Sequence, residues 1–174
     1  MTLTTSQKIN ETKRSFHKYL ADNLSGVQID FDDKDFTPPT DSAFIVIRYR
    51  SIARESCGIG GVLTGDSSSL HGYWRNIEAH ISIYKRDDPQ KADIGLLYDT
   101  IENLLKVGDI TLYDFTDPED PVAAGKIYLD TLKAASGPSP LDGRLFDNLA
   151  SRELADASFA WMSLGVLLSV LVEY

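Results

Sequence analysis

The sequence has almost no cysteine, fewer basic than acidic residues, and no long hydrophobic run. Cys57 is the single cysteine among 174 residues, so no disulfide bond can form within the chain, and a reducing cytosol suits it. No stretch reaches the roughly 18 apolar residues that a membrane helix needs. The polar start, MTLTTSQKINETKR, is unlike a secretory signal. We therefore expect a protein that is made in the cytoplasm and has no membrane partner.

The low number of basic residues argues against a surface that binds nucleic acid. The chain has 17 Lys and Arg against 26 Asp and Glu, a formal net charge of -9. Binding to a phosphate backbone depends on Lys and Arg contacts, so DNA or RNA binding is not expected. The hydrophobic fraction of 43% and the charged fraction of 25% are those of an ordinary globular protein. The length favours a single domain over residues 1–174.

Nucleotide-binding motifs are also lacking, although the segment GIGGVLTGDSSSLHGYW (58–74) is rich in glycine. A phosphate loop needs a lysine after its last glycine, but Asp66 follows Gly65. The dinucleotide pattern fails as well, because Leu63 stands three residues after Gly60. We therefore predict no cofactor.

Catalytic and metal-binding patterns are equally weak. Asp66, His71 and the serines 67–69 contain the residue types of a hydrolase, but a glycine- and serine-rich loop does not hold a nucleophile against its base. Cys57, His71 and His80 have no recurring zinc spacing. The acidic stretch DFDDKDF lacks the glycine of a calcium loop. The sequence predicts neither an enzyme nor a metal site.

Two segments have helical periodicity. Apolar residues from Ile9 to Leu24 predict a helix with Thr5 or Ser6 as its N-cap and Gly26 as its stop. The second helix is expected after DDPQ, with Asp88 as N-cap and Pro89 at its first position. It should bury one apolar face and end at Gly108; the residues of that face are Ile94, Leu97, Ile101, Leu104 and Leu105.

Strand patterns fill much of the rest. Alternating or β-branched runs predict strands at 27–31, 44–52, 75–86, 109–115, 126–132 and 159–174. A helix remains an alternative for 126–132, and a buried helix for the last run, in which Gly165 could mark a bulge. Loops are expected at 32–43 and 116–126. We predict an α+β fold, a mostly antiparallel sheet with two main helices packed on it, with a flexible loop at about 54–74 and an irregular segment at about 137–158 that includes a helical turn near 145–149.

Six arginine and aromatic residues are candidates for a protein interface. They form two triplets, one near the end of a predicted strand and one at the start of the next: Arg48, Tyr49, Arg50, Tyr73, Trp74 and Arg75. Arg, Tyr and Trp are enriched where proteins meet. The alternative is a strand that leaves the core and runs into solvent. The glycine-rich segment 58–74 is long and has no active-site chemistry, which favours contact with a large partner.

The order and texture of the segments resemble a known family. The residues that carry the resemblance are AFIVIRYR, NIEAHISIYKRD and DIGLLYDTIENLLKVGDITLYDF, followed by the closing hydrophobic strand. The chain resembles the tail terminator proteins of long-tailed bacteriophages, also called tail completion or tail-to-head joining proteins. The resemblance covers most of the chain and is weaker from Leu141 to Ser158. It is a likeness of order, length and strand pattern, without an invariant motif.

This resemblance implies a structural virion protein at the tail–neck junction. The subunit would form a hexameric ring that caps the tail tube, ends its polymerisation and joins the tail to the head connector, while DNA passes through the lumen without specific binding. The family has no catalytic residues to transfer. A ring needs heterologous contacts, in which one patch meets a different patch on the neighbour. The partners are thus further copies of this chain, the tail tube protein and the head-to-tail connector.

The acidic balance suits a lumen through which DNA must slide, because carboxylates repel phosphates. Candidate lumen residues lie in two acidic runs: Asp32, Asp33, Asp117, Glu119 and Asp120. The usual role of such charge runs is a solvated loop. Three alternative functions remain: another phage neck or head-completion protein, a small cytosolic protein-binding adaptor, and an enzyme that uses Asp66, His71 and a loop serine.

Overall fold

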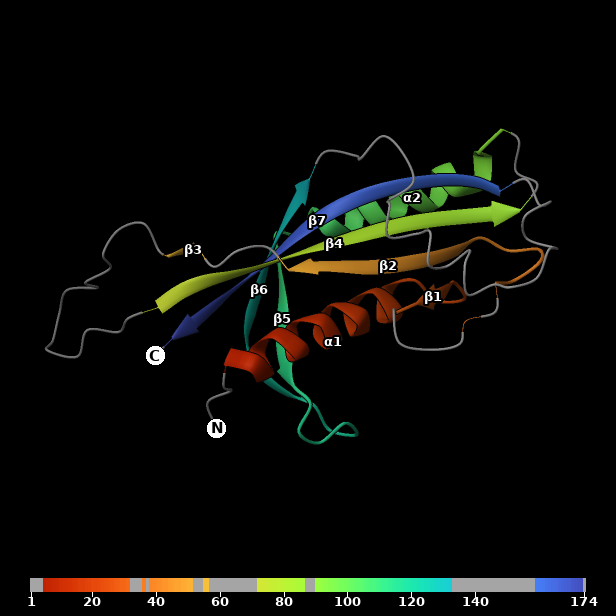
Figure 1. Ribbon diagram of the computed structural model, residues 1–174. Helices are drawn as coiled ribbons and strands as arrows, with labels where there is room; N and C mark the ends of the chain where they lie inside the picture. The colour runs from red at the N-terminus through yellow and green to blue at the C-terminus, as the bar shows by residue number, and fades with distance from the viewer. Residues whose placement is uncertain are drawn as a thin grey trace, which may run out of the picture.

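The computed structural model describes residues 5–31, 36, 38–51, 55–56, 72–86, 90–132 and 159–173. Two helices and seven strands lie in these ranges (Figure 1). In chain order they are α1 (Thr5–Asn23), β1 (Gln28–Asp30), β2 (Phe44–Ser51), β3 (Glu55–Ser56), β4 (Gly72–Arg86), α2 (Ala92–Leu105), β5 (Asp109–Asp114), β6 (Val122–Leu132) and β7 (Phe159–Glu173).

The described strands form one mixed sheet. Its strand order is β1-β2-β4-β7-β6-β5, and β3 pairs with β4 beside this path. β1 runs parallel to β2, and every other pairing is antiparallel. The longest pairing joins β4 to β7, both 15 residues long, from Gly72 opposite Glu173 to Arg86 opposite Phe159. A sheet with two helices confirms the α+β class, and the parallel pair makes the sheet mixed.

The main core lies between one face of the sheet and both helices. α1 contributes Phe16, Leu20 and Leu24 to it, and α2 contributes three further apolar side chains, Ile94, Ile101 and Leu105. The sheet contributes alternate residues of its central strands: Ile45, Ile47, Ile77, Ala79, Ile81, Ile83, Leu164, Val166, Leu168 and Val170. Removing one Leu or Ile side chain from water stabilises a fold by about 1.5–3 kcal/mol.

The helix ends follow local backbone chemistry. Gly26 and Gly108 follow α1 and α2 with φ of +82° and +85°, a conformation that glycine adopts without a Cβ clash. The predicted start of α2 is wrong. The helix begins at Ala92, and its N-cap is Lys91 with φ of 54° and no side-chain cap. Asp88 and Pro89 lie outside the described residues.

Three strand details differ from the sequence pattern. β6 begins at Val122, within the expected loop 116–126, because Val122 and its neighbours pair with the end of β5. Gly165 is not a bulge: it lies in unbroken register opposite His80 of β4. The register shift occurs instead between Leu112 and Tyr113. The pairing of β5 with β6 decides the first and third points, and the pairing of β4 with β7 decides the second. Residue composition does not report either pairing.

The last run is a strand, as predicted, and the buried-helix alternative is wrong. The stretch 126–132 is also a strand. The expected flexible loop at 54–74 lies mostly outside the described residues; its described parts form β3 and the first residues of β4. The segment 137–158, with the helical turn expected near 145–149, lies outside them entirely.

The burial pattern of α2 gives a direct test of this packing. Ile101 is fully buried, whereas Leu96 on the same helix is 71% exposed. We expect Ile101→Ala to lower the free energy of unfolding by about 2–5 kcal/mol, and Leu96→Ala to change it by less than about 0.5 kcal/mol. Urea denaturation followed by circular dichroism measures both. Equal effects of the two variants would contradict the placement of the core.

Candidate protein-interaction surface

The sheet brings the two predicted interface triplets to the same end of neighbouring strands. Arg48, Tyr49 and Arg50 lie on β2 opposite residues 80 to 78 of β4, and β2 ends at the next residue, Ser51. The triplet Tyr73–Arg75 lies on β4 just beyond that end. Sequence reasoning could not place the triplets together, because their adjacency depends on the β2–β4 register.

The pleat then separates the members of each triplet. Side chains alternate between the two faces of a strand. Tyr49 shares the helix-covered face with Ile45 and Ile47. Arg48 and Trp74 lie on the opposite face, where a small second cluster forms around Phe44, Val46 and Tyr84. The six residues therefore cannot form one continuous patch.

Arg48 is engaged in a contact within the subunit. Its Nη2 donates a hydrogen bond to Asp30 Oδ2 at 2.8 Å, and its Nη1 donates to the carbonyl oxygen of Ile47 at 3.0 Å. The two side chains of this ion pair are 11% and 5% exposed. The pair joins β1 to β2 and adds to their three parallel backbone pairings.

Tyr49 is half-buried against α1. The ammonium of Lys13 lies 5.0 Å from the centre of its ring, and the His17 ring lies 5.4 Å away. His17 in turn stacks on Phe31 with ring centroids 3.8 Å apart. For Arg50 and Tyr73 the structure describes the backbone, which pairs with Glu78 and with Ser56 and Val172 respectively.

The ends of β4 and β7 extend beyond β2 and β6 as an arm, made of Gly72–Asn76 and Val170–Glu173. β2 pairs with β4 only from Ile77 onward, and β6 pairs with β7 only as far as Ser169. Figure 1 shows these ends, with β3 beside them, reaching away from α2. Lys8 of α1 secures the arm, because its Nζ donates to the carbonyl oxygen of Leu171 at 3.2 Å.

An aromatic and apolar patch occupies the face of the sheet opposite the helices, at the base of the arm. Trp74 lies opposite Leu171, and its ring meets the ring of Tyr128 edge-on at 5.5 Å. Tyr128 is 45% exposed and Leu171 37% exposed. We call Trp74, Tyr128 and Leu171 the arm patch. Close by, Asn76 is 4% exposed and its Oδ1 has no hydrogen-bond partner among the residues that the structure describes.

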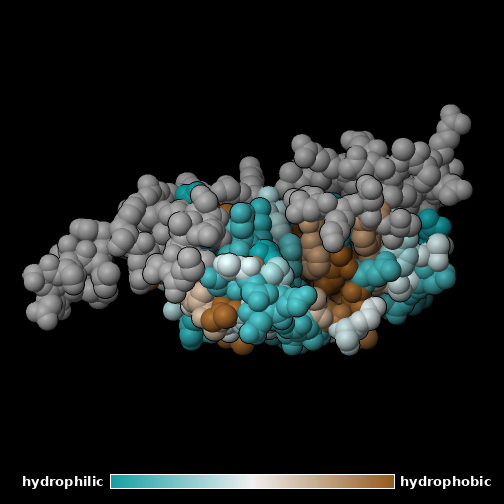
Figure 2. Space-filling view, turned by 90° about the horizontal axis from the view of Figure 1, so that it is seen from below, coloured by the Kyte–Doolittle hydropathy of each residue, from teal (hydrophilic) through white to brown (hydrophobic). Residues whose placement is uncertain are grey.

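Sequence reasoning found Trp74 but missed the other two members of the arm patch. Tyr128 and Leu171 come from strands distant in the chain, and only the sheet order joins them. The alternation of the two strands contained a usable signal, since each residue is out of phase with buried neighbours such as Leu129 and Val170. The other large hydrophobic residues exposed in the described part are Leu96, Val107 and Val122. From below, hydrophobic residues reach the surface in a band beside hydrophilic areas (Figure 2).

The acidic residues predicted for a lumen fall into two groups. Asp117, Glu119 and Asp120 are exposed in the turn between β5 and β6, and Asp117 Oδ1 accepts a hydrogen bond from the Glu119 amide at 3.0 Å. Asp32 and Asp33 lie outside the described residues.

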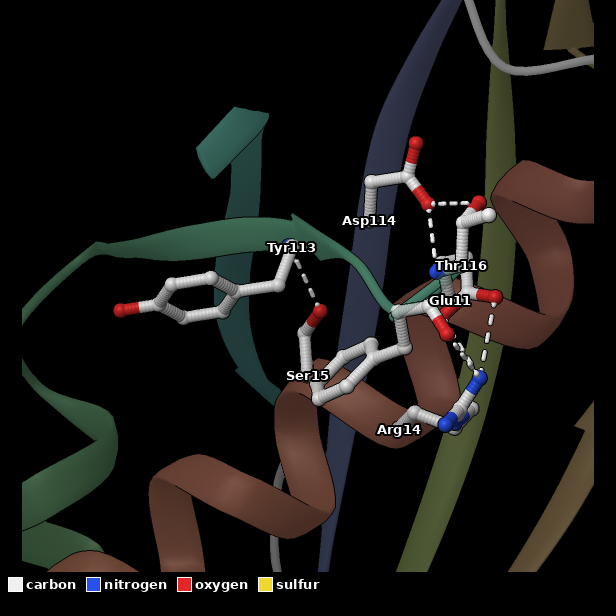
Figure 3. Close-up of polar contacts among 7 residues, drawn as sticks. Glu11, Arg14, Ser15, Tyr113, Asp114 and Thr116 are labelled. Carbon is white, nitrogen blue, oxygen red and sulfur yellow. Dashed lines mark hydrogen bonds and ion pairs between the residues drawn. The ribbon is translucent and has the colours of Figure 1, made fainter. Parts of the chain in front are cut away.

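Asp114, at the end of β5, accepts two hydrogen bonds on one carboxylate oxygen. Thr116 donates both, from its hydroxyl at 2.6 Å and from its backbone amide at 2.8 Å (Figure 3). The hydroxyl, and then the amide, hold the pKa of Asp114 below its usual value, since both donors favour the ionised form. The turn therefore begins at a carboxylate that stays charged.

A polar groove of about 250 Å³ separates α1 from β5. It is lined by Ser15, Lys18, Tyr19, Asp22, Asp109, Ile110, Thr111 and Tyr113. Lys18 pairs with Asp22 at 2.8 Å, and this hydrogen bond raises the pKa of the lysine. Lys126 pairs with Asp109 at 3.0 Å, and that hydrogen bond likewise raises the pKa of Lys126.

The described ranges hold neither a metal-binding group nor a membrane-spanning helix. No three His, Cys, Asp or Glu side chains there are grouped to hold a metal ion. None of the helices described is long and apolar enough to cross a membrane. Cys57, Asp66, His71 and the serines 67–69 lie outside the described residues, so the alternatives built on them stay untested.

Comparisons with known proteins give structural likenesses and no sequence relative. No family model and no curated protein matches the chain. One solved chain, described as Np_888769.1, shares 11% identity with a TM-score of 0.43, over 92% of this chain and 94% of that one. Another is a sheath/tube terminator in the extended state, from an extracellular contractile injection system (PVC), at 15% identity and a TM-score of 0.36. The match spans 100% of this chain and 58% of the neighbour's length. At these scores the likenesses assign no function.

The buried ion pair should matter far more to stability than an exposed one. We expect Asp30→Ala to destabilise the fold by about 3–5 kcal/mol, because it leaves the Arg48 charge buried and uncompensated. Asp22→Ala, which removes the exposed partner of Lys18, should have no measurable effect. Thermal and urea unfolding report both. The double variant Asp30→Leu with Arg48→Met should recover most of the lost stability. If Asp30→Ala is as stable as Asp22→Ala, the ion pair does not stabilise the attachment of β1 to β2.

The pKa of Asp114 should depend on the hydrogen bond from the Thr116 hydroxyl. Thr116→Ala removes the hydroxyl, so we expect the pKa of Asp114 to rise toward its ordinary value. The pKa of Asp114 is lower in the folded protein than in the unfolded chain. Its contribution to folding stability is therefore complete above the pKa of the unfolded chain, and it is lost as the pH falls through the pKa of the folded protein. Carboxyl carbon chemical shifts followed by NMR titration measure the change. Thr100→Ala on α2 is the control, and an unchanged Asp114 titration in Thr116→Ala would refute the assignment.

Proposed function

We propose that this chain is a tail terminator subunit, a structural protein that forms a ring at the junction of a phage tail with its neck. The ring caps the tail tube, ends its polymerisation and joins the tail to the head connector. In this proposal the chain is not an enzyme, and it acts in the virion after assembly in the host cytoplasm. The resemblance seen in the sequence suggests this role, and the arm patch is the observation that carries it.

The arm patch has the properties of a protein contact. Trp and Tyr supply large, stiff apolar surfaces and are concentrated where partners bind. Trp74, Tyr128 and Leu171 lie on a part of the sheet that no described helix covers, next to strands that extend past their neighbours. Burying such a patch against a second copy uses the driving force that builds the core.

A closed ring requires two different patches on each subunit, because its contacts are heterologous. The arm patch supplies one candidate. The outer side of α2, with Leu96 71% exposed, lies on the opposite face of the sheet and supplies a second. The exposed acids Asp117, Glu119 and Asp120 suit a lumen, since carboxylates there repel DNA phosphates and let the duplex slide.

The first experiment is the mass of the purified chain by light scattering, with negative-stain images of the same sample. We expect rings of about six copies of the 19.3 kDa subunit, either alone or after tail tube protein from the same phage is added. Added to growing tubes, the chain should cap them and limit their length. A chain that stays monomeric and leaves tube growth unchanged would contradict the proposal and favour the adaptor.

A matched pair of variants tests the arm patch itself. Tyr128→Ser with Leu171→Ser makes two exposed residues polar, so we expect folded monomers that no longer form rings or cap tubes. Tyr113→Ser, at a half-buried ring outside the patch, should leave assembly intact. Circular dichroism confirms folding in each case. Normal rings from the Tyr128 and Leu171 double variant would show that the patch is not the contact.

A further inference from the structure

The hairpin of β5 and β6 has a firmly packed base and a separate tip. At the base, Ile110, Leu112, Ile127 and Leu129 point into the main core and are at most 9% exposed. Beyond Leu112 the burial ends, and residues 116–120 are all exposed. We call residues 113–122 the tip.

A backbone irregularity lies at the boundary between base and tip. The register of β5 and β6 shifts between Leu112 and Tyr113: Leu112 lies opposite Gly125, but Tyr113 lies opposite Ala123, so Ala124 is an extra residue. Gly125 has φ of +153°, which glycine tolerates better than residues with a Cβ. A bulge interrupts the ladder locally, bends the bulged strand and increases its twist. The ladder resumes beyond it, with Tyr113 opposite Ala123 and Asp114 opposite Val122.

The tip rests on α1 (Figure 3). The Tyr113 amide donates to Ser15 Oγ at 2.9 Å, and Ser15 is 1% exposed. Arg14 Nη1 lies 3.4 Å from the carbonyl oxygen of Phe115, and its guanidinium lies 4.4 Å from the centre of the Phe115 ring. Glu11 holds the same Nη1 at 3.3 Å. We call Glu11, Arg14 and Ser15 the latch.

The tip also has hydrogen bonds of its own. Asp114 accepts from Thr116, and Asp117 accepts from Glu119. These short-range bonds do not involve α1, so they can persist if the tip leaves the helix. A preformed tip, a bulge at its boundary and a small set of contacts are parts that a two-position element can use.

We propose that the tip is a strap that rotates about the bulge between a position latched on α1 and a released position, and that Arg14 and Ser15 set the balance between them. Release frees the guanidinium of Arg14 from Phe115 and the ammonium of Lys18 from the face of Tyr113, 6.0 Å away in the latched position. It also moves the acidic turn away from the helix. This strap belongs to the single subunit, so it does not depend on the proposed ring.

NMR of the isolated chain tests the strap. We expect the amide signals of the non-proline residues in 113–122 to share one exchange process in relaxation-dispersion experiments, since they move together. Ser15→Ala and Arg14→Gln should each raise the released population by about threefold to tenfold, the effect of losing one hydrogen bond. The tip signals should then shift along common lines, and the double variant should shift them further than either single variant. Signals of Ile110, Leu112 and Ile127 should stay in place.

Two variants separate the strap from a local disturbance. Ser15→Thr keeps the hydroxyl and should restore the signals of the unaltered chain. Lys106→Gln removes an exposed cation at the C-cap of α2 and should leave the tip unchanged. Arg14 is 44% exposed, so Arg14→Gln should fold even if Ser15→Ala does not. Shifts confined to residues next to each substitution, with no shared exchange across the tip, would overturn the proposal.

Discussion

The antiparallel pairing of β4 with β7 is the constraint on which the rest of the structure depends. It joins Gly72–Arg86 to Phe159–Glu173 without a register shift, although the two segments are far apart in the chain. Every other part of the sheet attaches directly or through a neighbour to this pair: β2 and β3 to β4, and β6 to β7. A slip of one residue would exchange the faces of a strand and expose residues such as Ile81 or Leu168 to solvent. The register is therefore held by the core that it creates.

The two helices cover only one face of this sheet, and that asymmetry divides the molecule chemically. The covered face is apolar and closes around Phe16, Ile101 and their neighbours. The other face holds a small aromatic cluster, the buried Arg48–Asp30 pair, and the arm patch. An ion pair of low exposure is costly unless well matched, and this pair joins the side chains of β1 and β2 with a hydrogen bond of 2.8 Å. The arm patch leaves the side chains of Tyr128 and Leu171 partly exposed on that face.

α1 has a second role, because its polar side chains meet two exposed strand edges. Lys8 donates to the Leu171 carbonyl where β7 extends past β6, and Ser15 accepts from the Tyr113 amide on the outer edge of β5. Free edge groups invite pairing with other chains. α1 thus packs against the core and also forms hydrogen bonds with backbone groups at the edges of β7 and β5. The same arrangement leaves the tip of the β5–β6 hairpin attached mainly through α1, which makes the strap possible.

By itself, the sequence determined the local elements of this protein. Helical spacing from Ile9 to Leu24, alternation in the strands and glycines at positive φ depend on neighbours in the chain, so their patterns can be read from the residues. It also determined that Trp74 and Asp117 would be candidates of the right chemistry. Tertiary structure alone decided which of those residues meet. Arg48 pairs with Asp30, and Trp74 lies beside Tyr128 and Leu171. The bulge lies at Leu112 and not at Gly165. Each of these outcomes depends on the register between paired strands, and that register is set by the packing of the whole core, which no local pattern contains.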